Sequence, residues 1–99
     1  MIFRFEDRRL DALYETEEDA KKYPAEVVEA FFRRMASIKE AKDERDLRAL
    51  KGARLEKLKG EEDRYSMRLN VKWRLILRFE RDAGGGVVVV LEISDHYGD

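Results

Sequence analysis

The stretch YSMRLNVKWRLILRF, residues 65–79, decides the fold of this chain. Apolar and polar side chains alternate through it, and a period of two is typical of strands that bury one face. The pattern predicts one strand at residues 63–69 and another at residues 72–81. The side chains predicted to face the core are Tyr65, Met67, Leu69, Trp73, Leu75, Leu77 and Phe79.

The opposite face of these two strands carries arginines. Alternation puts Arg68, Arg74 and Arg78 together on a sheet face that no helix covers. Guanidinium groups match phosphate through bidentate, charge-assisted hydrogen bonds, so this face could bind a polyanion. Surface ion pairs are the alternative use of the same arginines. The carboxylates available for such pairs are Glu80, Glu92 and Asp95.

Two further strands complete the predicted sheet. The glycines within Asp82–Gly86 suit a hairpin turn, because glycine adopts positive φ readily. The segment Val87–Ser94 that follows is β-branched and nearly all apolar, which predicts a central strand buried on both faces. Ile2–Phe5 is predicted to be a short first strand.

Two helices are predicted between the first and second strands. Asp7 can cap the first helix, whose apolar stripe comprises Leu10, Leu13 and Tyr14, and Glu15–Lys22 is expected to continue it as a frayed, charged segment. Pro24 suits the first turn of the second helix. The predicted apolar face of that helix comprises Val28, Phe31, Phe32, Met35 and Ile38. Asp43 can cap a short helical turn that runs to Leu50.

This order of elements, β-α-α-β-β-β, predicts the fold class. We expect an α+β domain spanning residues 1–99, with a small antiparallel sheet and the two N-terminal helices packed on one face. A chain of this length is large enough for one core.

Composition excludes several classes of protein. The chain has no cysteine and one histidine among 99 residues, which argues against disulfides and a structural metal site. No apolar run is long enough to span a membrane, and the N-terminus lacks the apolar stretch of a signal peptide. We therefore expect a cytoplasmic protein that needs no metal or other cofactor.

The near-neutral net charge of −1 conceals a basic middle segment. Residues 51–81 hold 10 Lys/Arg and 5 Asp/Glu, a net charge of +5. Such a segment suits a polyanion, and it equally suits a solvated strand surface held by ion pairs.

Three titratable residues, Asp95-His96-Tyr97, stand near the end of the sequence, directly after the predicted buried strand. A histidine titrates near neutral pH and can act as a general acid or base. A lone histidine near a terminus is also a common ordinary surface residue, and the residues alone leave both interpretations open.

An ordered series of short motifs runs through nearly the whole chain: Leu58-Lys59-Gly60, Tyr65-Ser66, Asn70-x-x-Trp73-Arg74 and Glu92-Ile93-x-Asp95. The series resembles the HigB branch of the RelE/ParE superfamily, the toxins of type II toxin–antitoxin pairs. The resemblance implies a ribosome-dependent endoribonuclease that cuts mRNA without a metal. In this reaction the 2′-hydroxyl of a nucleotide attacks its own scissile phosphate, while cations stabilise the developing charge.

The resemblance and the residue pattern together suggest a site. The predicted catalytic residues are Lys59, Arg74, Asp95, His96 and Tyr97. The predicted RNA-binding residues are Lys57, Arg68 and Arg78. The family usually ends in Asp-Tyr-His, so His96 and Tyr97 have exchanged places here.

The resemblance also implies partners. They are the ribosome with its mRNA and a helix-turn-helix antitoxin similar to HigA. The toxin would contact DNA only indirectly, through this antitoxin. Two other functions suit the same fold: a ParE-like toxin directed at gyrase, and a decayed module that binds its antitoxin without catalysis.

Overall fold

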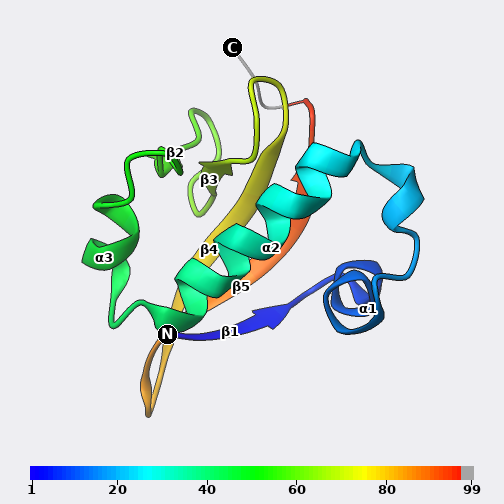
Figure 1. Cartoon of the computed structure of the whole chain (residues 1–99). Helices are drawn as coiled ribbons and strands as arrows, with labels where there is room; N and C mark the ends of the chain where they lie inside the picture. Colours follow the sequence, from blue (N-terminus) through cyan, green and yellow to red (C-terminus); the bar gives the residue numbers. More distant parts are fainter. Residues whose placement is uncertain (97–99) are drawn as a thin grey trace.

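The computed structural model describes residues 1–96 as one sheet with helices on one side (Figure 1). Its elements in chain order are β1 (Ile2–Phe5), α1 (Arg8–Thr16), the 3₁₀ turn η1 (Ala20–Lys22), α2 (Ala25–Glu40), α3 (Glu44–Arg48), β2 (Glu56–Lys57), β3 (Tyr65–Arg68), β4 (Arg74–Asp82) and β5 (Gly85–Ser94). The predicted α+β class is confirmed.

The sheet has five strands in the order β1-β5-β4-β3-β2. All neighbours pair antiparallel except β1, which runs parallel to β5, with Ile2 opposite Val87. The prediction of an antiparallel sheet is therefore right for four strands and wrong for the first. Parallel pairing needs a long crossover, and here most of the chain lies between the two strands.

The last strand is central, as predicted. β5 lies between β1 and β4, and its residues Val87–Leu91 are buried. The β4–β5 hairpin turns at the predicted glycines, with Gly85 at a φ of 119°. One irregularity interrupts the β4–β5 pairing at Ile76/Leu77, where Leu91 is the extra residue on β5.

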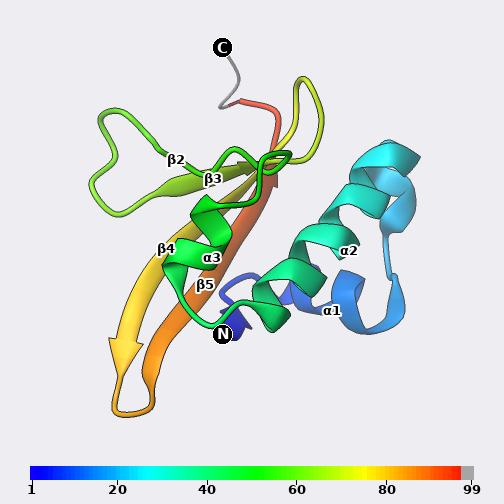
Figure 2. The ribbon, with the colours of Figure 1, turned by 60° about the vertical axis from the view of Figure 1, so that its left-hand side comes forward.

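The helices cover one face of the sheet (Figure 2). Asp7 caps α1 as predicted, since its carboxylate accepts a hydrogen bond from the backbone N–H of Arg9. The expectation that Glu15–Lys22 continues this helix is wrong, because Glu17 adopts left-handed backbone geometry and ends it at Thr16.

The buried face of α2 is rotated slightly from the prediction. Val27 is fully buried, whereas Val28 and Phe32 are only half-buried. Phe31, Met35 and Ile38 are buried as predicted. The buried positions then follow an i, i+4, i+8, i+11 stripe, which is one face of a helix.

Two elements differ from the predicted order. The short turn after Asp43 is the third helix, α3, and Asp43 caps it by accepting from the backbone N–H of Arg45. β2 was not predicted, because Glu56 and Lys57 are both charged and exposed and give no alternating pattern. β2 forms the edge of the sheet next to β3.

Candidate functional site

The turn between β3 and β4 is built by the side chain of Asn70. Its Oδ1 accepts hydrogen bonds from the backbone N–H groups of Lys72 at 2.9 Å and Trp73 at 2.7 Å. Its Nδ2 donates to Glu26 of α2 at 3.2 Å. An asparagine that caps two backbone N–H groups in this way ends a strand and reverses the chain. This is why β3 ends at Arg68 and β4 begins at Arg74, inside the predicted strands.

The turn brings two arginines face to face. Arg68, at the end of β3, is directly opposite Arg74, at the start of β4. Arg68 Nε donates to the Asn70 carbonyl at 3.2 Å, and Arg74 Nη1 donates to the same oxygen at 2.9 Å and to the Trp73 carbonyl at 3.3 Å. Both guanidinium groups are therefore held against one carbonyl.

No carboxylate within residues 1–96 forms an ion pair with Arg68 or Arg74. Arg74 is only 8% exposed, so part of its hydration is already lost. Like charges directly opposite on neighbouring strands destabilise a sheet. An anion placed between the two guanidinium groups would remove that repulsion, so this arrangement suits a phosphate.

The end of β5 lies beside this turn (Figures 1 and 2). Ser94 is paired with Arg74, and its Oγ accepts from the backbone N–H of His96 at 3.0 Å. Asp95 lies between two basic groups, 3.7 Å from Lys72 Nζ and 3.7 Å from His96 Nε2. The structure thus brings Arg68, Arg74 and the Asp95–His96 pair to one end of the sheet.

The predicted catalytic residue Tyr97 lies outside the described residues. The His96 side chain is 87% exposed and the Asp95 side chain 31% exposed. The histidine is therefore open to solvent at the same end of the sheet as the two arginines.

The third predicted arginine, Arg78, lies on the same face of β4 but already has acidic partners. Its Nη2 is 2.7 Å from Glu80 and its Nη1 is 3.5 Å from Glu6. The pKa of Arg78 is raised, chiefly because its side chain donates a hydrogen bond to Glu80. Of the two interpretations offered by the sequence, the ion pair with Glu80 holds for this arginine.

The two lysines of the β2 region do not join the arginines equally. Lys57 is paired with Tyr65, whose ring packs on Phe79 in the helix-covered core, so the pleat turns Lys57 away from the arginine face. Glu56, opposite Ser66, lies on the arginine face instead, so the predicted RNA-binding residue Lys57 does not share a face with Arg68. Lys59 is exposed in the loop after β2.

Two positioning residues were not predicted. Asn70 builds the turn, and an asparagine after a strand is a recognisable turn signal. Arg34 of α2 donates to the carbonyls of Arg68 at 2.8 Å and Gly52 at 3.0 Å, and burial lowers its pKa. No local pattern could identify Arg34, because its partner is 34 residues away.

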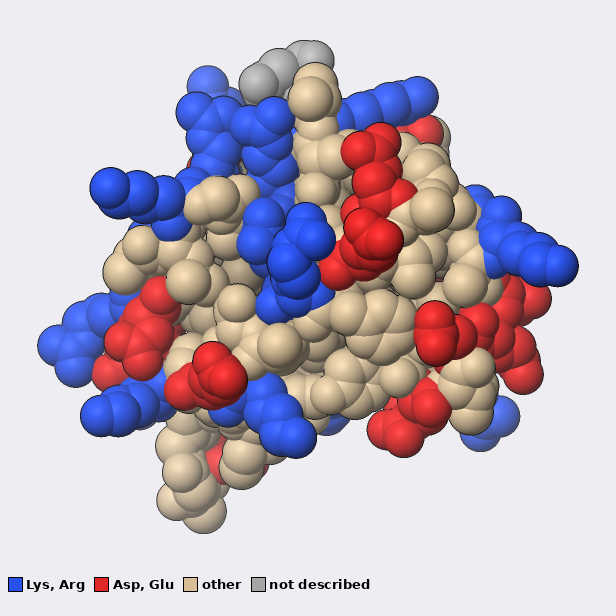
Figure 3. Space-filling view, in the orientation of Figure 1, with Lys and Arg blue, Asp and Glu red and all other residues tan. Residues whose placement is uncertain are grey.

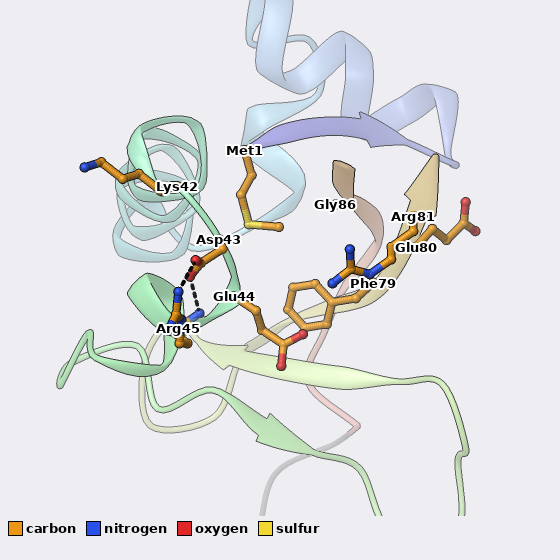
Figure 4. Close-up of a pocket in the computed structure, with 9 residues that line it drawn as sticks. All are labelled: Met1, Lys42, Asp43, Glu44, Arg45, Phe79, Glu80, Arg81 and Gly86. Carbon is orange, nitrogen blue, oxygen red and sulfur yellow. Dashed lines mark hydrogen bonds and ion pairs between the residues drawn. The ribbon is translucent and has the colours of Figure 1, made fainter. Parts of the chain in front are cut away.

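A cavity of about 610 Å³ lies at the other end of the sheet (Figure 4). It is lined by Met1, Lys42, Asp43, Glu44, Arg45, Phe79, Glu80, Arg81 and Gly86. None of the residues at the β3–β4 turn or at the end of β5 contributes to it. The candidate site is thus an open surface, which suits a long substrate better than an enclosed small molecule.

Charge is unevenly distributed over the helix-covered face. Figure 3 shows Lys and Arg gathered at the upper left, on the side of β2 and β3, whereas Asp and Glu lie mostly to the right. Within residues 1–96, no three acidic or histidine side chains are grouped to hold a metal ion. None of the described helices is long and apolar enough to cross a membrane.

Comparison with known proteins places this arrangement in a family. The family of RelE-like toxins of the type II toxin–antitoxin system HigB matches residues 3–96. The chain belongs to the HigB-like toxin family. The HigB-like chain is 32% identical to Toxin HigB-1 of Vibrio cholerae serotype O1 (strain ATCC 39315 / El Tor Inaba N16961) over 80 residues, which is 80% of this chain and 84% of the relative.

Solved structures support the same fold. The YoeB/ParE toxin from Agrobacterium tumefaciens superposes with a TM-score of 0.63 over 98% of this chain and 100% of that chain, at 21% sequence identity. The protein is thus a HigB-like toxin of the RelE/ParE superfamily, and membership of a type II system implies a cognate antitoxin partner.

Proposed function

We propose that this HigB-like toxin is a ribosome-dependent mRNA endoribonuclease. The observation that carries the proposal is the pairing of Arg68 with Arg74, with no described carboxylate to neutralise either of them. A ribonuclease of this kind needs concentrated positive charge at the scissile phosphate, because negative charge accumulates there in the transition state.

The reaction needs no group other than RNA and protein side chains. The 2′-hydroxyl oxygen forms a bond to the adjacent phosphorus as its proton leaves to a base. The bond from phosphorus to the 5′-oxygen then breaks, and an acid gives that oxygen a proton. The products are a 2′,3′-cyclic phosphate and a free 5′-hydroxyl, so every proton and oxygen is accounted for.

The side chains divide these tasks. Arg74 and Arg68 bind the non-bridging oxygens of the phosphate and stabilise the charge that develops on them. His96 and Tyr97 are the groups that transfer protons. Asp95, 3.7 Å from His96, orients the imidazole. Lys59 supplies a further positive charge.

Outlying residues contribute less in this proposal. Arg78 binds RNA only in competition with Glu80, which already holds it. Lys57 points to the other face of β2 and could reach RNA only at the sheet edge. We therefore expect the main RNA contacts at the β3–β4 turn.

The ribosome and its mRNA are the proposed substrate complex in the cytoplasm. The antitoxin is proposed to be a helix-turn-helix protein similar to HigA. It would supply all contacts to DNA.

The test is induced expression in bacterial cells with transcriptome-wide mapping of mRNA 5′ ends. Wild-type toxin should arrest growth and create new ends inside translated codons, and Arg74→Ala should abolish both. Thermal unfolding and antitoxin binding of Arg74→Ala verify that the variant still folds.

Two outcomes contradict the proposal. Growth arrest with unbroken transcripts would point to a protein target such as gyrase. Wild-type protein that binds its antitoxin but neither arrests growth nor cuts mRNA would be a non-catalytic binding module.

A further inference from the structure

A chain of ion pairs crosses the open face of the sheet, which is the face opposite α1 and α2. One oxygen of Glu80 accepts from Arg4 Nη2 at 3.0 Å. The other accepts from Arg78 Nε at 2.9 Å and lies 2.7 Å from Arg78 Nη2. Arg78 also reaches Glu6 at 3.5 Å. Glu80 is the only one of the two acids that contacts both arginines.

This chain lies on the same face as the candidate site. Arg74, Arg78 and Glu80 alternate along β4, and Arg4 flanks Val89 of β5 on one side while Arg78 flanks it on the other. Arg74 and Arg78 are four residues apart, or about 13 Å along a strand. Without Glu80, four arginines would follow one another along the open face: Arg68, Arg74, Arg78 and Arg4.

The intervening surface gives a bound nucleic acid little else to hold. The apolar side chains between these charges, Ile76, Val87, Val89 and Leu91, are buried with Leu58 packed against them, so they offer a nucleic acid almost no exposed area. Charge therefore decides how far along this face an RNA backbone can extend.

We propose that Glu80 is a specificity-determining residue that confines RNA to the Arg68–Arg74 end of the open face. It occupies the guanidinium groups of Arg4 and Arg78, so that an RNA phosphate would have to displace a carboxylate to reach them. The free toxin then binds RNA weakly and locally. This inference rests on the proposed RNA-cleaving function.

The predicted result of Glu80→Gln follows from the number of freed arginines. The amide keeps the shape of the side chain but releases the charge, which exposes Arg4 and one side of Arg78 to phosphate. The affinity for RNA at low salt should rise roughly two- to fivefold. Each added phosphate contact should also steepen the dependence of log K on log salt by about 0.7.

The experiment measures binding of a short 2′-O-methyl RNA oligomer to the purified full-length toxin by fluorescence anisotropy over a salt series. The modified ribose prevents cleavage during the measurement. The matched control is Glu29→Gln, which makes the same change in charge at an exposed position on α2. The double variant Glu80→Gln/Arg78→Gln restores the net charge and removes one of the freed arginines.

We expect the RNA affinity of Glu80→Gln to depend more steeply on salt than that of Glu29→Gln. The double variant should partly restore the wild-type salt dependence. Equal salt slopes for Glu80→Gln and Glu29→Gln would overturn it. Arg74→Ala, measured in parallel, separates this failure from that of the proposed function. If Arg74→Ala binds RNA as well as wild type does, the proposed RNA site itself is wrong.

Discussion

The start and the middle of β4 carry the same residue type in opposite electrostatic settings. At its start, Arg74 faces Arg68 across the sheet, and no described carboxylate reaches either one. Four residues later, Arg78 is held by Glu80 and Glu6. The first arginine belongs to a pair that repels, and the second belongs to a network of zero net charge.

The difference shows that the sequence position of an arginine predicts the face on which it lies, but not whether its charge is neutralised by an acidic partner. Both arginines alternate with the apolar residues of β4, so both lie on the open face. Their neighbours on other strands decide whether the charge is available to a substrate. Repulsion is tolerated at one end because the Asn70 carbonyl accepts from both guanidinium groups there.

The largest effect that would test this comparison is on catalysis. Arg74→Ala should remove a charge-assisted contact to the transition state, about 1.5–3 kcal/mol, which is roughly a 10- to 150-fold loss of cleavage rate. Arg78→Ala should cost less than this, because Glu80 already holds that guanidinium. Cleavage of a programmed mRNA on purified ribosomes measures both variants. Equal losses of cleavage rate in the two variants would mean that Arg74 and Arg78 do not differ in their role.

The second effect concerns the turn that holds the arginines. Asn70→Ala leaves the N–H groups of Lys72 and Trp73 without their acceptor, and should lower the free energy of unfolding by about 1–2 kcal/mol. Asn70→Asp keeps the acceptor but replaces the donor to Glu26 with a second carboxylate. Because that contact is exposed, the repulsion should cost less than the lost acceptor, and the variant should unfold closer to wild type. Urea denaturation distinguishes them, and equal losses would mean that the Glu26 contact, not the turn, matters.

The strands and core of the protein could be predicted because their signal is local. Alternation identified β3, β4 and the faces of their side chains, and the apolar run identified β5 as central. The parallel pairing of β1 could not be predicted, since four residues without a local partner do not show which edge they join.

The candidate site was predictable only in part, for a related reason. The sequence placed Arg68 and Arg74 on one face and offered Glu80 as a partner for the arginines, but the second partner of Arg78, Glu6, is 72 residues away. The face on which Lys57 lies could not be predicted, because β2 is too short and too polar to show an alternation. Arg34 holds backbone carbonyls, which no sequence pattern reveals.

A smaller effect on the free energy of unfolding should have opposite signs at Arg68 and at Arg78. Arg68→Gln keeps a side-chain donor for the Asn70 carbonyl but removes the repulsion with Arg74. It should therefore raise the free energy of unfolding by about 0.2–1 kcal/mol at low salt while reducing cleavage. Arg78→Gln breaks an ion pair and should lower the same quantity. Thermal unfolding of both variants at low and high salt checks the signs, and a loss of stability in Arg68→Gln would show that the guanidinium group is structural.

The smallest effect should come from the outer member of the ion-pair network. Glu6 is 57% exposed and lies 3.5 Å from Arg78, so Glu6→Gln should change the free energy of unfolding by at most about 0.5 kcal/mol. High salt should erase even this difference, because screening acts most strongly on exposed charges. Glu80→Gln should lower stability more at low salt, since Glu80 contacts two arginines at shorter distances. If Glu6→Gln proved the more damaging of the two, Glu6 rather than Glu80 would hold Arg78, and the difference between Arg74 and Arg78 would depend on the residue that follows β1 instead of on β4 itself.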